Sequence, residues 1–150
     1  MIADLCDSNV WLALALSGHV HHRAARAWLD VADRPRSVLF CRSTQQAFLR
    51  LLTNPAILAP YGNSPLTNTE AWQAYEALLA DERIELRADE PADLEPRWKL
   101  FALRDTASPK LWMDAYLAAF AVASGARLVT TDGAFSQFDG LDLHLIRDSR

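Results

Sequence analysis

Three aspartates stand where this chain could perform chemistry on phosphates. Asp7 follows the short apolar segment "IADLC", and Asp132 follows "RLVTT", so each carboxylate comes where a predicted strand ends. Asp114 lies in the first turn of the apolar segment "LWMDAYLAAFAVAS". In an open sheet of parallel strands, side chains at the carboxyl ends of neighbouring strands project from the same edge. The two strand-end carboxylates are therefore expected to lie close together.

Asp114 taken alone has an ordinary explanation, because the dipole of a helix stabilises a carboxylate in its first turn by about 0.3–1 kcal/mol. However, this helix is apolar nearly all round, and an unpaired carboxylate on a buried helix is costly. Crowded carboxylates also raise one another's pKa unless a divalent cation neutralises them. Asp7, Asp114 and Asp132, here called the acidic cluster, offer only oxygen ligands, which predicts a Mg²⁺ or Mn²⁺ site.

Short apolar segments alternate with longer segments of helical periodicity along the chain. Strands are predicted at residues 2–6, 37–40, 84–86, 127–131 and 143–146, helices at 10–16, 24–31, 43–52, 67–81, 94–103 and 111–124, and a loop at 56–66. This alternation is typical of parallel strands with helices on both faces of the sheet. The predicted fold is therefore an α/β fold with three layers, in which helices flank a short, mostly parallel sheet.

Composition limits the class of protein. With 150 residues, 51% of them hydrophobic, the chain can form one core, and we expect one domain over residues 1–150. It has neither an apolar run of roughly 18 residues, as a membrane span requires, nor a secretory signal at its start. Cys6 and Cys41 form no CxxC pair, so a cytoplasmic location is expected. The net charge of −4 argues against broad electrostatic capture of nucleic acid.

Several histidines and arginines are further candidates for binding a metal or a phosphate. The histidines of "HVHH" at 19–22 lie in a predicted turn, and we interpret them as solvated polar side chains rather than a metal site. Arg23, Arg26, Arg42 and Arg50 could contact phosphates, and about half of them are expected simply to lie on a solvated helix face. Arg42 and Arg50 flank the helix that carries Gln45, and these two are the better candidates for binding substrate phosphates.

The chain resembles the PIN-domain ribonucleases, specifically the VapC toxins of bacterial toxin–antitoxin pairs, over nearly its whole length. The segments that carry the resemblance are "LCDSNVWLAL", "RSTQQAFLRLLTNP", "LWMDAYLAAFAVASGARLVTTD" and "FSQFDGLDLHLI". The resemblance implies that the acidic cluster binds metal and is catalytic, and that Asn9 is the amide that helps to hold the first aspartate. It also implies a hydroxyl beside the last aspartate, at Thr130 or Thr131, of which we select Thr131.

Two positions depart from the family pattern. The family usually carries a Glu on the helix after the second strand, where this chain has Gln45 and Gln46, and often a further Asp where it has Ala134. The amide oxygen of Gln45 can accept from a metal-bound water but brings no charge. We therefore expect one well-occupied Mg²⁺, replaceable by Mn²⁺, and tighter metal binding if a Glu is restored at position 45 or 46.

The resemblance implies a Mg²⁺-dependent endoribonuclease that acts as the toxin of a toxin–antitoxin pair. A bound Mg²⁺ polarises a phosphoryl oxygen and lowers the pKa of a coordinated water, as hydrolysis of a phosphodiester requires. The resemblance also implies a homodimer and a VapB-type antitoxin that covers the acidic groove. Specific DNA binding by the chain itself is not expected, because its net charge is negative and no groove-reading motif is present.

Two other functions stay open on the residues alone. One is another Mg²⁺-dependent phosphohydrolase. An aspartate nucleophile of that kind usually has a second carboxylate two residues later, where this chain has Asn9. Such an enzyme also needs a catalytic lysine, and this chain has only Lys99 and Lys110. The other is a catalytically weakened or dead PIN-fold binding module, which the missing Glu favours and the three retained aspartates oppose.

Overall fold

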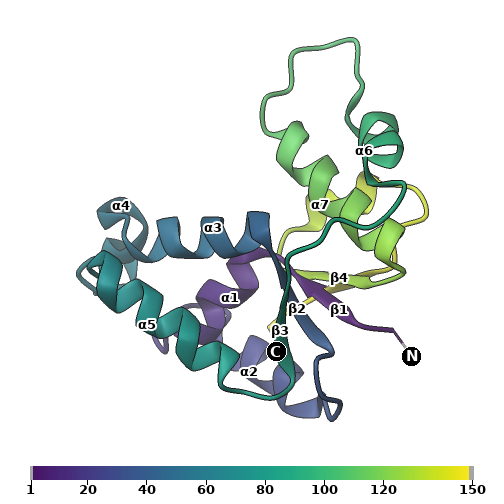
Figure 1. Ribbon diagram of the computed structural model, residues 1–150. Helices are drawn as coiled ribbons and strands as arrows, with labels where there is room; N and C mark the ends of the chain where they lie inside the picture. Colours follow the sequence, from purple (N-terminus) through teal and green to yellow (C-terminus); the bar gives the residue numbers. More distant parts are fainter. Residues whose placement is uncertain (1, 149–150) are drawn as a thin grey trace.

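The computed structural model describes residues 2–148 and places a single parallel sheet at its centre (Figure 1). The sheet has the order β3-β2-β1-β4-β5, and every pairing in it is parallel. Its strands are β1 (Asp4–Cys6), β2 (Val38–Cys41), β3 (Ile84–Arg87), β4 (Arg127–Thr130) and β5 (Leu143–Leu145). The chain runs outward from β1 in one direction and then returns to its other side, so the topological switch point lies between β1 and β4.

Helices cover both faces of this sheet, which confirms the three-layer α/β prediction. One face carries α1 (Ser8–Ala15), α2 (His22–Val31), α3 (Arg42–Leu52) and α5 (Asn68–Leu79), and the other carries α6 (Leu94–Ala102) and α7 (Leu111–Ser124) (Figure 1). Alternate strand residues point to opposite faces. Accordingly, Phe40 packs in the core with Trp11 of α1, whereas Leu39 packs in the core with Phe120 of α7. No helix among residues 2–148 is long and apolar enough to span a bilayer.

The segment 56–66, predicted as a loop, instead contains two short helical turns, α4 (Pro55–Leu58) and the 3₁₀ helix η1 (Ala59–Tyr61). Pro60 and Pro65 favoured a loop, but Pro60 lies in the first turn of η1, and Pro55, just before the segment, lies in the first turn of α4, where its missing N–H costs nothing. The Asn54 side chain caps this turn by accepting from the Ala56 N–H at 3.0 Å. A third short turn, η2 (Gly133–Gln137), follows β4 and was also not predicted.

Candidate active site

Asp7 is held by hydrogen bonds with strand β4 and with the start of helix α1. Its backbone N–H donates to the Val129 carbonyl of β4 at 2.9 Å, which extends the β1–β4 ladder by one residue. Its Oδ1 accepts from the Ser8 N–H at 2.7 Å and thereby caps α1, and its Oδ2 accepts from the Thr130 hydroxyl at 2.9 Å. Both oxygens of this carboxylate are therefore oriented by the junction of β1, α1 and β4.

Thr130 joins the acidic cluster to the end of β4. This completely buried hydroxyl donates to Asp7 and accepts from the Asp132 N–H at 3.0 Å, and Asn9 Nδ2 lies 3.5 Å from it. The amide oxygen of Asn9 in turn accepts from the Thr131 N–H at 3.4 Å. The hydroxyl beside the acidic cluster is thus that of Thr130, and Thr131, which the sequence analysis selected, contributes its backbone instead.

The remaining two aspartates come from the other face of the sheet. Asp132 caps η2, because its Oδ1 accepts from the Ala134 N–H at 2.9 Å, and its Oδ2 lies 3.7 Å from the ammonium of Lys110. Asp114 lies in the first turn of α7, four residues after Lys110. Lys110 was missed as a site residue, although this four-residue spacing on a helix start places its side chain near Asp114.

The pKa values show that the acidic cluster acts as one electrostatic group. Burial raises the pKa of Asp7, and the charges of Asp114 and Asp132 raise it further, while the hydrogen bonds from Thr130 and Ser8 oppose the rise. Burial likewise raises the pKa of Asp114, and Asp132 adds to this, whereas the Lys110 ammonium lowers it. The structure therefore brings the three predicted aspartates within range of one another's charge at the carboxyl edge of the sheet.

The chemistry of this group suits a hard cation. All of its donors are carboxylate oxygens, and binding a divalent ion would relieve the repulsion that raises the pKa of Asp7. Among residues 2–148, no three His, Cys, Asp or Glu side chains converge tightly enough to enclose an ion by themselves. Mg²⁺ does not need such an enclosure, because it is commonly bound by one or two carboxylates, waters and the phosphates of a substrate.

Known proteins resemble this chain in sequence over nearly its whole length. The model of the PIN domain family matches residues 5–141. Ribonuclease VapC41 from Mycobacterium tuberculosis is 61% identical over 142 residues, which cover 95% of this chain and 97% of VapC41. The chain belongs to the VapC family of PIN-domain proteins.

Solved structures show the same PIN fold as this VapC-family chain. The crystal structure of VapC20 from Mycobacterium tuberculosis, described as a sarcin–ricin loop cleaving toxin, matches with a TM-score of 0.62 at 21% identity, over 93% of this chain and 98% of VapC20. The structure of VapBC2 from Rickettsia felis bound to a DNA fragment of its promoter matches with a TM-score of 0.64 at 14% identity, over 98% and 100% of the two chains. At these identities the likeness shows the fold alone.

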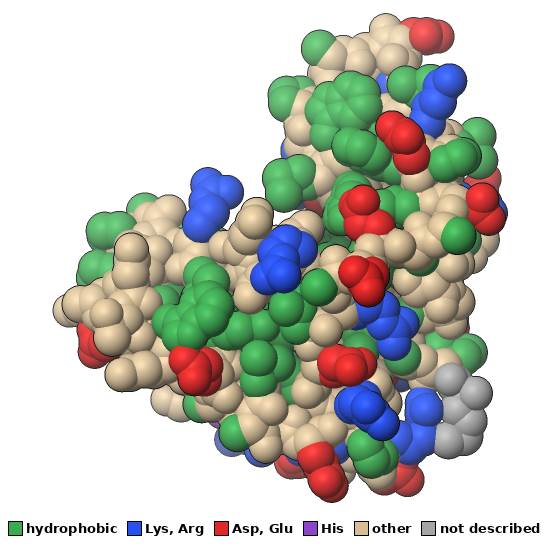
Figure 2. Space-filling view, viewed as in Figure 1, with side chains coloured by type: hydrophobic (Ala, Val, Ile, Leu, Met, Phe, Trp, Pro, Cys, Tyr) green, Lys and Arg blue, Asp and Glu red, His purple; other side chains and the backbone are tan. Residues whose placement is uncertain are grey.

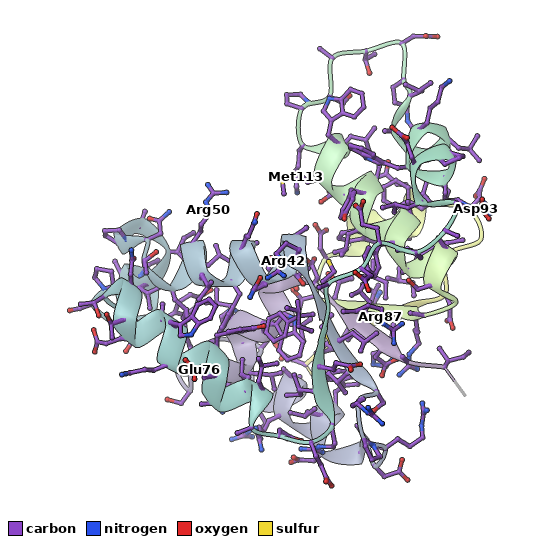
Figure 3. The ribbon with its side chains drawn as sticks, in the orientation of Figure 1. Arg42, Arg50, Glu76, Arg87, Asp93 and Met113 are labelled. Atoms are coloured by element: carbon purple, nitrogen blue, oxygen red, sulfur yellow. The ribbon has the colours of Figure 1, made fainter. Side chains whose placement is uncertain are left out.

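In this VapC-family chain, Arg42 and Arg50 lie at opposite ends of α3. Both are exposed, and Figure 3 shows Arg50 pointing away from α3 while Arg42 lies at the end of α3 nearest the sheet. Arg42 directly follows β2, the neighbour of β1, so it stands at the same sheet edge as Asp7. The molecular surface is indented between these arginines and the α6–α7 layer (Figure 2). Their role in binding phosphates stays a prediction.

Gln45 lies in a different place from the one predicted. Its side chain is buried, and its Oε1 accepts from Arg42 Nη1 at 2.6 Å. Burial raises the pKa of Tyr75 in α5, and a hydrogen bond with Gln45 lowers it. Gln45 therefore belongs to the contact between α3 and α5, which gives no support to a contact with a metal-bound water.

The histidines of "HVHH" have local structural roles. His19 is buried rather than solvated, stacks on Tyr61 with ring centroids 4.7 Å apart, and accepts from the His21 N–H at 3.0 Å. Burial lowers the pKa of His19, with further lowering from His21 and His22. His22 Nδ1 lies 2.8 Å from the Ala13 carbonyl oxygen. That this motif is not a metal site stays a prediction, and its description as solvated was wrong for His19.

Proposed function

We propose that this chain is an endoribonuclease, the toxin of a toxin–antitoxin pair, which hydrolyses RNA phosphodiester bonds with a Mg²⁺ held by the acidic cluster. The observation that carries the proposal is the convergence of Asp7, Asp114 and Asp132 from both faces of the sheet, with the pKa of Asp7 raised by burial and by the other two. Crowded carboxylates destabilise the metal-free protein, and this cost is offset only when a cation and a phosphate are bound. The relative VapC41 is named a ribonuclease.

The residues that would hold the ion are Asp7 and Asp114, with Asp132 binding directly or through water, and we expect Mn²⁺ to substitute for Mg²⁺. The bound ion supplies a polarised phosphoryl oxygen and a water of lowered pKa. The chain itself supplies orientation: Thr130 and Ser8 fix the two oxygens of Asp7, so that little reorganisation is needed when substrate arrives.

We further propose a VapB-type antitoxin partner and a homodimer in the cytoplasm. A solved neighbour in fold, with a TM-score of 0.56 at 16% identity, is described as a toxin–antitoxin complex from Klebsiella pneumoniae. Large apolar side chains are exposed together on and beside α6 and α7, as the green areas of that layer in Figure 2 illustrate, and exposed apolar patches mark protein interfaces. These side chains are Leu100, Leu103, Trp112 and Met113. Without its antitoxin, the chain is not expected to bind DNA specifically.

Mapping the 5′ ends of cellular RNAs after induction tests the proposal. We expect new, discrete ends with the wild type and none with Asp7→Asn or Asp114→Asn, because each change removes a metal ligand. Asp89→Asn, at an exposed aspartate outside the acidic cluster, is the matched control and should cleave like the wild type. The purified wild type should cleave the mapped RNA in Mg²⁺ or Mn²⁺ and not with EDTA.

Two outcomes would contradict the proposal. Cleavage that persists in EDTA, or in Asp7→Asn at the wild-type rate, would exclude the acidic cluster as the catalytic metal site. A wild type that cleaves no RNA with either metal, while still binding a neighbouring antitoxin, would identify a PIN-fold binding module instead.

A further inference from the structure

A cavity of about 380 Å³ opens beside Asp114, on the side of α7 that faces η2. The segment between α6 and α7 forms one wall and contributes Arg104, Thr106 and Ser108, while Lys110 and Asp114 contribute from the start of α7. We propose that this cavity binds the RNA phosphate adjacent to the one that is cleaved. The inference rests on the proposed function, because it assigns part of the substrate of the same site.

The charge of the cavity favours an anion. Of the side chains that line the cavity, Arg104 and Lys110 are positive and Asp114 is negative, while Asp132, which lies 3.7 Å from the Lys110 ammonium, and Asp105 lie outside the lining. Within the described residues, Arg104 uses one of its N–H groups on the Leu103 carbonyl at 3.1 Å, and a guanidinium has five such donors. A chain with a net charge of −4 needs local cations of this kind if RNA is to approach an acidic cluster.

The hydroxyls of the cavity add hydrogen-bonding capacity for phosphate oxygens. The Oγ atoms of Thr106 and Ser108 lie 3.2 Å apart, so the two hydroxyls share one hydrogen bond and leave a second hydrogen available as a donor. Guanidinium, ammonium and hydroxyl groups together are the side chains that most often contact phosphates in nucleic-acid complexes.

Lys110 connects the cavity with the acidic cluster. Its ammonium lies 3.7 Å from Asp132 Oδ2, but its side chain is 80% exposed. An ion pair this exposed contributes little, so the ammonium can turn toward a bound phosphate at small cost. In the absence of substrate it offsets part of the negative charge of the acidic cluster, which is seen in its lowering of the pKa of Asp114.

The position of the cavity gives the RNA a direction across the site. Arg42 and Arg50 lie on α3, which covers one face of the sheet, and the cavity lies beside α7, which covers the other face (Figure 1). A single strand that passes over the acidic cluster would meet the arginines of α3 at one end and Arg104 with Lys110 at the other. This continuity favours an RNA phosphate over an acidic peptide as the occupant.

Binding of a fluorescent single-stranded RNA that contains the mapped cleavage site tests the inference. Measurements use the full chain with Asp7→Asn to prevent cleavage, in EDTA, over a series of salt concentrations. We expect Arg104→Ala and Lys110→Ala each to weaken binding roughly tenfold and to reduce the slope of log K against log salt by about 0.7, the value for one phosphate of a single strand. Arg104→Lys should restore most of the binding, because it keeps the charge.

Arg97→Ala is the matched control, since Arg97 is exposed on α6 and does not line the cavity. In the cleaving protein, Arg104→Ala should raise KM roughly tenfold with little change in kcat, because it acts on binding alone. If Arg104→Ala and Lys110→Ala bind RNA like the control, the inference is overturned while the ribonuclease proposal survives. A loss seen only in inhibition by the antitoxin overturns it in favour of a peptide site. A wild type that cleaves nothing overturns the proposed function first.

Discussion

Replacing Thr130 with valine removes one buried hydroxyl from the centre of the acidic cluster and changes the shape of the side chain very little. The hydroxyl donates to Asp7 Oδ2 at 2.9 Å, and a hydrogen bond to a charged group contributes about 1.5–3 kcal/mol to stability. The same oxygen accepts from the Asp132 N–H at 3.0 Å, whose loss costs about 1 kcal/mol. We therefore expect the free energy of unfolding at pH 7 to fall by about 2–4 kcal/mol.

The loss should depend on pH with a definite sign. The Thr130 hydrogen bond lowers the pKa of Asp7, so its removal raises that pKa above the value in the wild type. In acid, where the Asp7 carboxyl is protonated in both proteins, the lost bond to Asp7 is a neutral one that contributes only about 0.5–1.5 kcal/mol, while the loss of the bond from the Asp132 N–H is the same as at pH 7. The difference between Thr130→Val and the wild type should thus be largest at neutral pH and shrink as pH falls.

Urea unfolding of the metal-free proteins at neutral and acidic pH measures these differences in the free energy of unfolding. In thermal unfolding at neutral pH, Tm should fall by roughly 5–15 °C. Thr130→Ser keeps the hydroxyl and should retain most of the stability. Thr131→Val is the matched control, because the contact found for Thr131 uses its backbone N–H, and it should change stability by less than about 0.5 kcal/mol. RNA cleavage should fall at least tenfold in Thr130→Val. Equal stability and activity of Thr130→Val and Thr131→Val would refute the role assigned to the Thr130 hydroxyl.

Three further predictions follow from contacts of the same kind. Asp7→Asn should stabilise the metal-free protein at pH 8 and not at pH 3, because the pKa of Asp7 is raised in the folded protein and wild-type stability therefore falls as the pH rises through that pKa. Melting curves in EDTA at both pH values measure this, and an equal gain in stability at pH 3 and pH 8 would contradict the prediction. Gln45→Glu should leave the Mg²⁺ affinity, measured by calorimetry, within about threefold of the wild type, because the new carboxylate would pair with Arg42. Tighter Mg²⁺ binding would instead support the expectation from the sequence that a Glu at this position strengthens the metal site. Arg127→Met should lose about 1–3 kcal/mol in urea unfolding, since its Nε and Nη2 contact Asp4 at 2.8 and 3.1 Å, yet keep the wild-type cleavage rate because this pair lies at the opposite end of the strands.

The sequence predicted the parts of this protein that depend on repeating patterns. The alternation of strands and helices indicated a parallel sheet, and that alone places residues following β1 and β4 at one edge. The helix 111–124 was predicted with the bounds it has in the structure, because its apolar run ends at Gly125, which adopts the left-handed conformation that favours glycine. The proximity of Asp7, Asp114 and Asp132 followed from these elements.

Features that depend on single-residue register could not be predicted in this way. Thr130 and Thr131 are equivalent in the sequence, and only the end of β4 decides which hydroxyl turns into the protein. The burial of the Gln45 side chain against Arg42 and Tyr75 could not be predicted, because the rotation of a helix about its axis depends on how it packs. The cap of α4 was hidden because Asn54 and Pro55 indicate either a turn or a helix start.

The hydrogen bond between Thr130 and Asp7 joins residues that are 123 positions apart in the chain. Contacts of such long range form late in folding, because the chain entropy of closure must be overcome first. Asp7 and Asp132 are both hydrogen-bonded to Thr130 at the end of β4, whereas Asp114 belongs to α7, so a local opening of the α6–α7 layer would separate Asp114 from the other two aspartates while the strands stay paired. An activity that needs all three aspartates would therefore report the closed population of that layer rather than the stability of the whole chain, and a partner that shifted this opening equilibrium would switch it off without touching a carboxylate.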